Sequence, residues 1–79
     1  MKTAVMYTTA TCPYCLRAKQ LLQEKNIAYH EIRVDLDEQQ RDKMIALTGR
    51  RTVPQIYIDD QYIGGCDDLF AHFKKISNE

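Results

Sequence analysis

The sequence predicts an α/β domain in which a mixed four-stranded sheet is flanked by three helices. Segments typical of strands and amphipathic segments typical of helices follow one another in the order βαβ-α-ββ-α. A βαβ unit makes its two strands parallel, with a right-handed crossover, whereas two strands joined by a tight turn are antiparallel. The chain has 79 residues with no linker and no internal repeat, so we expect one domain over residues 1–79.

The first half of the chain supplies the βαβ unit. Residues 2–7 are a short apolar run, which favours a central strand. A helix then begins at Cys12, with Pro13 at its first helical position, and ends near Lys25. Its buried side is expected to carry Cys15, Ala18, Leu21 and Leu22. Residues 29–34 alternate in period two, and the polar face of Tyr29, Glu31 and Arg33 suits a strand at the sheet edge.

The middle of the chain predicts a second helix over residues 38–48. Asp37 has the properties of an N-cap, and Gln40 stands three residues later, in the register of a capping box. The helix carries Met44, Ile45 and Leu47, and Gly49 is expected to close it.

The last third predicts a hairpin and a helix. Residues 50–54 form a loop, and residues 55–58 and 62–63 form two strands joined by a turn at Asp59-Asp60. Gly64-Gly65 ends the hairpin, and a helix begins near residue 66. Leu69, Phe73 and Ile76 lie on one face of that helix.

Composition narrows the possible functions. Eleven basic residues balance eleven acidic ones, so no net charge attracts nucleic acid or an anionic membrane. The apolar run of residues 4–7 is too short for a signal peptide, and no segment reaches membrane-spanning length. Three cysteines, an odd number, argue against a secreted disulfide framework. We therefore expect a cytoplasmic monomer that binds neither nucleic acid nor membrane.

The C-x-x-C motif of Cys12 and Cys15 stands where the first strand gives way to a helix, which is typical of a dithiol redox motif. The unsatisfied N–H groups and partial positive charge of a helix N-terminus lower the pKa of a thiol placed there. Cys12 lies at the cap, and Cys15 lies one turn further on the apolar side. We therefore assign Cys12 as the nucleophile and Cys15 as the resolving thiol. A lowered pKa also makes Cys12 a better leaving group.

The cysteine pair has two alternative interpretations. Both thiols could be buried structural residues, although a strand-to-helix junction is a poor place to bury them. A zinc half-site is the second alternative, but structural zinc takes four ligands, commonly in two short-spaced pairs. The remaining candidates, Cys66, His30 and His72, form no second pair, so we expect no metal site.

With this motif in place, the chain resembles the glutaredoxin family, specifically the small bacterial-type dithiol glutaredoxins. The matching motifs are Y-T at 7–8, C-P-Y-C-x-R-A-K at 12–19, G-R-x-T-V-P-Q-I-Y-I at 49–58 and I-G-G-C-D-D-L at 63–69. The resemblance implies a thioredoxin fold and glutathione-dependent thiol–disulfide exchange, with glutathione as co-substrate and no tightly bound cofactor. The implied partners are glutathione and disulfide-containing or glutathionylated proteins, with ribonucleotide reductase as a candidate.

The resemblance further implies a glutathione groove beside Cys12. In that groove Pro54 would be cis, the backbone of Val53 would pair with the peptide part of glutathione, and Tyr14 and Thr52 would line the sides. A proline that opens a strand cannot donate to the sheet, which fits the position of Pro54.

The start of the last helix would bind the other end of glutathione. Backbone N–H groups around Cys66 and Asp67 would take the γ-glutamyl carboxylate, and the Asp67 carboxylate would lie near its ammonium group. Gly65, directly before this helix start, independently favours a cradle of backbone donors for an anion. Cys66 itself could be a redox partner, a glutathionylation site or a helix-start residue whose backbone matters, and we favour the last interpretation.

The chain departs from the family in the first loop. Many dithiol glutaredoxins carry a Lys or Arg two or three residues before the motif, but residues 9–11 here are Thr, Ala and Thr. Arg50 is the best replacement for that cation, with Arg51 as the other candidate.

Two alternative functions remain at this point. The first is a thioredoxin-like electron donor recycled by a flavoprotein reductase, against which the T-V-P and G-G-C-D-D motifs argue. The second is an iron–sulfur carrier in which Cys12 and glutathione hold a cluster, against which Pro13 argues, because cluster-binding relatives usually carry a smaller residue there.

Overall fold

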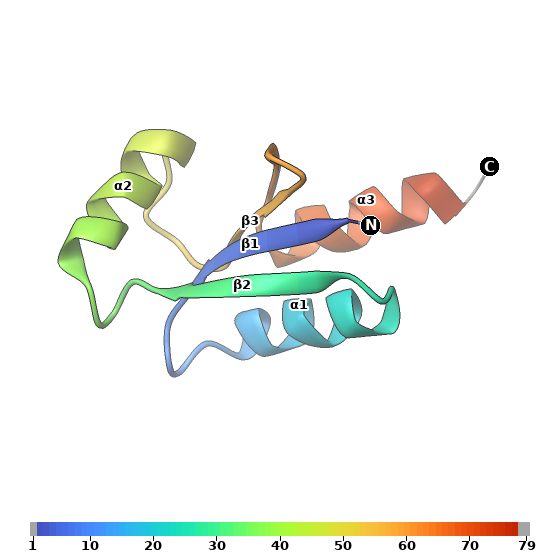
Figure 1. Ribbon diagram of the computed structural model, residues 1–79, viewed down its shortest axis with the longest axis horizontal. Coiled ribbons are helices and arrows are strands. Elements are labelled where there is room, and N and C mark those ends of the chain that lie inside the picture. The colour runs from blue at the N-terminus through green and yellow to red at the C-terminus, as the bar shows by residue number, and fades with distance from the viewer. Residues whose placement is uncertain (1, 78–79) are drawn as a thin grey trace.

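The computed structural model describes residues 2–77 of the chain, and the side chains of residues 2–75. The elements follow in the predicted order (Figure 1). They are β1 (Thr3–Thr8), α1 (Pro13–Glu24), β2 (Ala28–Arg33), α2 (Glu38–Thr48), β3 (Gln55–Ile58), β4 (Gln61–Gly64) and α3 (Cys66–Ser77).

The four strands form one mixed sheet in the order β2-β1-β3-β4. Strand β1 runs parallel to β2 and antiparallel to β3, and β3 and β4 form the predicted antiparallel hairpin. Asp59 and Asp60, which make its turn, both have positive φ angles of 49° and 67°, as a two-residue hairpin loop with a right-handed twist requires. The predictions of a central β1 and an edge strand β2 are confirmed.

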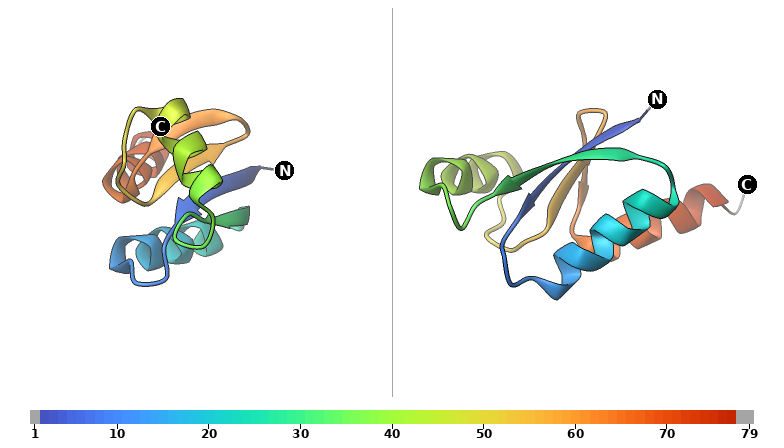
Figure 2. Two further views of the ribbon diagram at one scale, coloured as in Figure 1. Left: turned by 90° about the vertical axis from the view of Figure 1, so that its left-hand side faces the viewer. Right: turned by 60° about the horizontal axis from the view of Figure 1, so that its bottom comes forward.

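Helices cover both faces of the sheet. Helices α1 and α3 lie side by side on one face, and α2 lies on the other, toward the end where β1 and β2 finish (Figures 1 and 2). The core between the sheet and the pair α1 and α3 is the larger one, and it contains Ala4, Met6, Ala18, Leu21, Leu22, Ile27, Ile56, Ile58, Leu69 and Phe73. Beneath α2, a smaller cluster joins Tyr7, Val34 and Met44.

Helix α2 shows how far local rules extend. The Asp37 carboxylate accepts hydrogen bonds from the backbone N–H groups of Gln39 and Gln40, and Gly49 ends the helix in the left-handed conformation. The side-chain oxygen of Gln40 is buried without a hydrogen-bond partner. The reciprocal half of the predicted capping box is therefore not formed. On this helix Met44 is buried, whereas Leu47 is exposed.

The predicted end of β1 needs correction, and the structure shows what the polar face of β2 contacts. Thr8 belongs to β1 and not to the following loop, because it pairs with Arg33 and its hydroxyl binds Glu31. The polar face of β2 is not simply a solvent face. It is turned toward α1, where Tyr29 packs against the larger core and Glu31 pairs with a lysine. The side chain of Ile76, predicted to share a face with Leu69 and Phe73, lies outside the described residues.

Candidate active site

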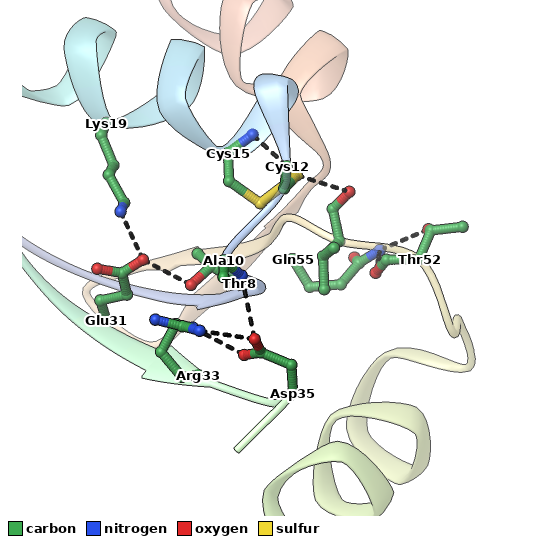
Figure 3. Close-up of a disulfide and its surroundings, with 11 residues drawn as sticks. Thr8, Ala10, Cys12, Cys15, Lys19, Glu31, Arg33, Asp35, Thr52 and Gln55 are labelled. Atoms are coloured by element: carbon green, nitrogen blue, oxygen red, sulfur yellow. Dashed lines mark hydrogen bonds and ion pairs between the residues drawn. A yellow bond between two sulfur atoms is a disulfide. The ribbon is translucent and has the colours of Figure 1, made fainter. Parts of the chain in front are cut away.

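The redox pair sits at the start of α1. Cys12 is the N-cap, with an extended backbone, and its Sγ accepts a hydrogen bond of 3.1 Å from the backbone N–H of Cys15. The two cysteines are joined by a disulfide, with their Cα atoms 5.2 Å apart (Figure 3). Cys15 is 2% exposed, whereas Cys12 is only half-buried. A substrate therefore reaches the sulfur of Cys12 first.

Local sequence explains why Cys12 is held this way. Pro13 occupies the first helical position, where its fixed φ suits a helix and its missing N–H is not needed. The Cys12 carbonyl oxygen accepts the first helical bond, from the N–H of Leu16 at 3.2 Å. The Cys12 side chain thus lies among the unsatisfied N–H groups of the first turn, where a thiolate is stabilised.

A hollow beside Cys12 is formed by the loop before β3 and the start of α3. The carbonyl oxygen of Val53 lies 3.8 Å from Cys12 Sγ, and the Val53–Pro54 peptide bond is cis, as the resemblance implied. All eight residues predicted to bind glutathione line this one hollow. They are Tyr14, Arg50, Thr52, Val53, Pro54, Gly65, Cys66 and Asp67. Gln55 and Asp68 complete the lining.

Asp68 is a lining residue that the sequence reasoning missed. Its carboxylate accepts the backbone N–H of Gly65 at 3.0 Å and lies 3.5 Å from the guanidinium of Arg50. A side chain at Gly64, which has a φ of 123°, would lie 2.7 Å from Asp68 Cγ, so this glycine allows the close approach. Asp68 stands three residues after Gly65 at a helix start, which is the capping-box spacing that could have identified it.

Gln55 is the second missed residue, and it is fully buried. Its side-chain amide donates to the carbonyl and hydroxyl oxygens of Thr52 at 3.0 and 3.1 Å. Its carbonyl oxygen accepts the hydroxyl of Tyr62 at 2.5 Å. Thr52 is therefore held by a chain of side-chain hydrogen bonds that starts at Tyr62 on β4 and passes through the buried Gln55. A buried amide needs such partners, so a glutamine at the start of an apolar strand was the available signal.

Two carboxylates on the β2 side hold the loop that leads to Cys12. Asp35 accepts the backbone N–H of Ala10 at 3.2 Å and a two-pronged pair of hydrogen bonds from Arg33 at 2.7 and 2.6 Å (Figure 3). The hydrogen bonds from Arg33 lower the pKa of Asp35 to about 2. The second carboxylate, Glu31, accepts the hydroxyl of Thr8 and the ammonium group of Lys19, each at 2.6 Å.

Cys66, the third cysteine, is a free thiol at the first position of α3. It is 6% exposed. Burial raises its pKa, the charge of Asp67 raises it further, and Arg17 lowers it. Cys66 and Cys12 both stand at helix starts, yet burial and a neighbouring carboxylate make Cys66 the poorer thiolate.

Among the described residues, His, Cys, Asp and Glu do not gather in groups of three that could hold a metal ion. Within residues 2–77, none of the helices has the length and apolar character needed to cross a membrane.

The chain is similar in sequence and in structure to known proteins. The sequence profile of the family described as Glutaredoxin matches residues 4–63. Glutaredoxin 3 of Escherichia coli strain K12 is 52% identical over 71 residues, which cover 90% of this chain and 86% of that protein. The solution structure of glutaredoxin from Brucella melitensis has a TM-score of 0.80 at 41% identity, covering 92% of this chain and 79% of that one. A buckwheat glutaredoxin–glutathione complex has a TM-score of 0.85 at 28% identity, covering 94% and 70%.

Proposed function

Because this chain belongs to the glutaredoxin family and is therefore a thiol–disulfide oxidoreductase, we propose that it reduces protein disulfides and protein–glutathione mixed disulfides at the expense of glutathione. The observation that carries the proposal is the hollow beside Cys12, which the predicted glutathione-binding residues share. The buckwheat relative in complex with glutathione, which has the same fold, also supports it.

Cys12 begins the proposed cycle. Its thiolate attacks one sulfur of a protein disulfide and forms a mixed disulfide, while the other sulfur leaves as a thiolate. Cys15 then attacks Cys12 Sγ, which releases the reduced protein and forms the Cys12–Cys15 disulfide. One glutathione attacks Cys12 and frees Cys15, and a second removes the first as glutathione disulfide. Two glutathione molecules thus supply the two electrons that the substrate gains.

A protein–glutathione mixed disulfide needs only Cys12. The Cys12 thiolate attacks the sulfur of glutathione, and the protein thiol departs. A second glutathione then attacks the Cys12-bound glutathione and leaves with it as glutathione disulfide. The half-exposed Cys12 and the buried Cys15 support this division, since only Cys12 meets both substrates directly.

In this proposal glutathione lies along the hollow and is bound at its peptide part and at both of its carboxylate ends. The backbone of Val53 pairs with its peptide part, between the side chains of Tyr14 and Thr52. The N–H groups at the start of α3, around Gly65, Cys66 and Asp67, take its γ-glutamyl carboxylate, because a helix N-terminus attracts anions. Arg50 takes the glycine carboxylate.

Glutathione serves as a co-substrate in this proposal, and no metal or other cofactor takes part. The protein acts as a single-domain monomer in a reducing cytoplasm. Disulfide-containing and glutathionylated proteins are its substrates, with ribonucleotide reductase as a candidate.

Turnover assays with Cys→Ser variants test the proposal. We expect Cys15→Ser to keep the reduction of a small glutathione mixed disulfide and to lose most reduction of a protein disulfide. Cys12→Ser should lose both activities. Equal loss of both activities in the two variants would show that the assigned roles are wrong. Reduction by a flavoprotein thioredoxin reductase, without turnover by glutathione, would favour the thioredoxin-like alternative.

Arg50→Ala tests how the glycine end is held. The guanidinium lies at the hollow beside Asp68 and is exposed enough to meet a ligand carboxylate. We expect the Km for glutathione to rise roughly three- to tenfold with little change in kcat, the effect of losing one partly solvated charged hydrogen bond. Arg51→Ala removes the same charge at the other candidate position, which does not line the hollow, and should leave the Km unchanged if Arg50 is the ligand. An unchanged Km in Arg50→Ala would remove Arg50 from the binding site.

A further inference from the structure

One carboxylate oxygen holds both ends of the segment that carries the redox pair. Glu31 Oε2 accepts the hydroxyl of Thr8 and the ammonium group of Lys19, each at 2.6 Å (Figure 3). Thr8 is the last residue of β1, and Lys19 lies one turn beyond Cys15 in α1. Glu31 therefore links the two ends of residues 8–19, the segment that contains both cysteines of the redox pair.

The sheet places Glu31 for this contact. Glu31 pairs with Met6 of β1, whose side chain belongs to the core beneath α1, so Glu31 faces the same helix. Thr8 lies two residues beyond Met6 and projects from the same face, which makes it the diagonal neighbour of Glu31. Glu31 itself lies on the edge strand β2, which is paired along its length with the central strand β1.

The contact of Glu31 with Thr8 and Lys19, called the clip below, is more buried than an ordinary surface ion pair. Thr8 is fully buried, and the side chains of Lys19 and Glu31 are only 26% and 27% exposed. Burial by itself would raise the pKa of Glu31, but the hydrogen bonds from Lys19 and Thr8 lower it below its ordinary value. The group is thus a carboxylate at neutral pH, able to accept both hydrogen bonds.

We propose that Glu31 is a positioning residue for Cys12: by binding Thr8 and Lys19 together, it keeps Cys12 at the cap of α1 in the reduced protein. In the oxidised protein the disulfide itself closes the turn between Cys12 and Cys15. After reduction that covalent link is gone, and the position of Cys12 Sγ near the N–H of Cys15 then depends on the local cap and on the spacing of β1 and α1 that Glu31 holds. This inference rests on the proposed role of Cys12 as the nucleophile.

A purely electrostatic role and a positioning role of Glu31 predict opposite shifts in the pKa of Cys12 when Glu31 is removed. Deleting a negative charge near the site, and leaving Lys19 unneutralised, would by electrostatics alone favour the Cys12 thiolate and lower its pKa. Loss of positioning moves the sulfur out of the field of the helix start, which raises the pKa of Cys12. The sign of the change therefore decides which role Glu31 has.

The test is the pH profile of Cys12 alkylation by iodoacetamide in the fully reduced protein, followed by mass spectrometry of the Cys12 peptide. We expect Glu31→Ala to shift the profile to higher pH and to slow alkylation at pH 6 by roughly two- to fivefold, the size of a lost helix-terminus interaction. Glu31→Gln keeps an oxygen for Thr8 and Lys19, so it should stay close to wild type. Glu24→Ala, which removes an exposed carboxylate near the far end of α1, is the matched charge control.

Thr8→Val tests the same contact without changing any charge. It can be measured even if Glu31→Ala fails to fold. It removes one hydrogen bond from the clip while keeping the shape of a buried side chain, so it should slow Cys12 alkylation in the same direction as Glu31→Ala. Faster alkylation in Glu31→Ala, or a wild-type profile in Thr8→Val, would overturn the proposal. If Cys12 of the wild type reacts no faster at pH 6 than Cys66, the proposed role of Cys12 fails first, and this inference fails with it.

Discussion

Helices α1 and α2 begin with nearly the same backbone and serve different ends. The φ and ψ angles are −123° and 100° at Cys12, and −141° and 104° at Asp37. In each case a side-chain atom of the N-cap accepts a backbone N–H from the first turn. The capping atom is the sulfur of Cys12 in α1 and a carboxylate oxygen of Asp37 in α2. The same capping geometry therefore holds a reactive group at the start of α1 and stabilises the helix at the start of α2.

The surroundings of the two caps explain the difference. Cys12 lies beside the hollow lined by Val53 and the start of α3, with its sulfur 3.8 Å from the carbonyl oxygen of Val53. Asp37 is exposed on the loop between β2 and α2 and is absent from that hollow. A capped helix start becomes a reaction site only where residues distant in the sequence build a binding surface beside it.

Cys12→Ser gives the largest expected effect in this comparison. Turnover of a glutathione mixed disulfide should fall by about three orders of magnitude or more, because a serine hydroxyl cannot replace the attacking thiolate. The free energy of unfolding of the reduced protein should change by less than about 0.5 kcal/mol, since serine is itself a preferred N-cap. Urea unfolding of both proteins in excess reductant measures the second quantity. A loss well above that limit would mean that the sulfur stabilises α1 beyond its role as a cap.

Asp37→Ala should show the reverse pattern. Removing the cap of α2 should lower the free energy of unfolding by about 1 kcal/mol, which corresponds to a Tm lower by roughly 4–8 °C in a chain of this size. Because Asp37 is remote from the hollow, kcat/KM below the melting range should stay within about twofold of wild type, for this exposed site. Asp37→Asn keeps a capping oxygen and is the control. Activity loss in Asp37→Ala without loss of stability would break the comparison.

Features set by neighbouring residues were predictable from the sequence, and features set by distant contacts were not. The caps at Cys12 and Asp37 and the turn at Asp59-Asp60 depend on a few consecutive residues, and all three were predicted. The resemblance to glutaredoxins added the members of the hollow, because its motifs are spread over the whole chain. Asp68 beside Arg50 was missed, since these residues meet across 18 positions.

The faces of β2 show why period-two alternation was insufficient. Alternation separates two sets of side chains, but it does not say which set a helix will cover. The polar set, with Glu31, is the one turned toward α1, where Lys19 supplies the partner that a carboxylate needs near a core. The contact joins residues 12 positions apart on different elements, so no local pattern signalled it.

Substitution of Asp35 gives the smallest expected effect on stability. It tests whether a carboxylate close to Asp37 in the sequence contributes to the loop before α1. Asp35 lies two residues before Asp37, yet it serves the other helix, because its carboxylate holds the N–H of Ala10 in the loop leading to Cys12. Arg33 lowers its pKa from 3.8 to about 2, so the folded state favours the carboxylate. The stabilisation is thus fully present above pH 3.8 and is lost as the pH falls through 2.

The variant Asp35→Asn removes this charge and keeps an oxygen for Ala10. We expect its Tm to lie slightly below that of wild type at pH 6, by an amount that shrinks with added salt, because the pair is exposed. The difference should shrink as the pH falls from 3.8 toward 2 and disappear below pH 2, where the wild-type carboxyl is protonated as well. A Tm difference that persists unchanged at pH 2 would mean that Asp35 acts through its shape and hydrogen bond alone. The ion pair with Arg33 would then contribute nothing to the loop before Cys12, and Asp35, like Asp37, would act only as an acceptor of a backbone N–H group.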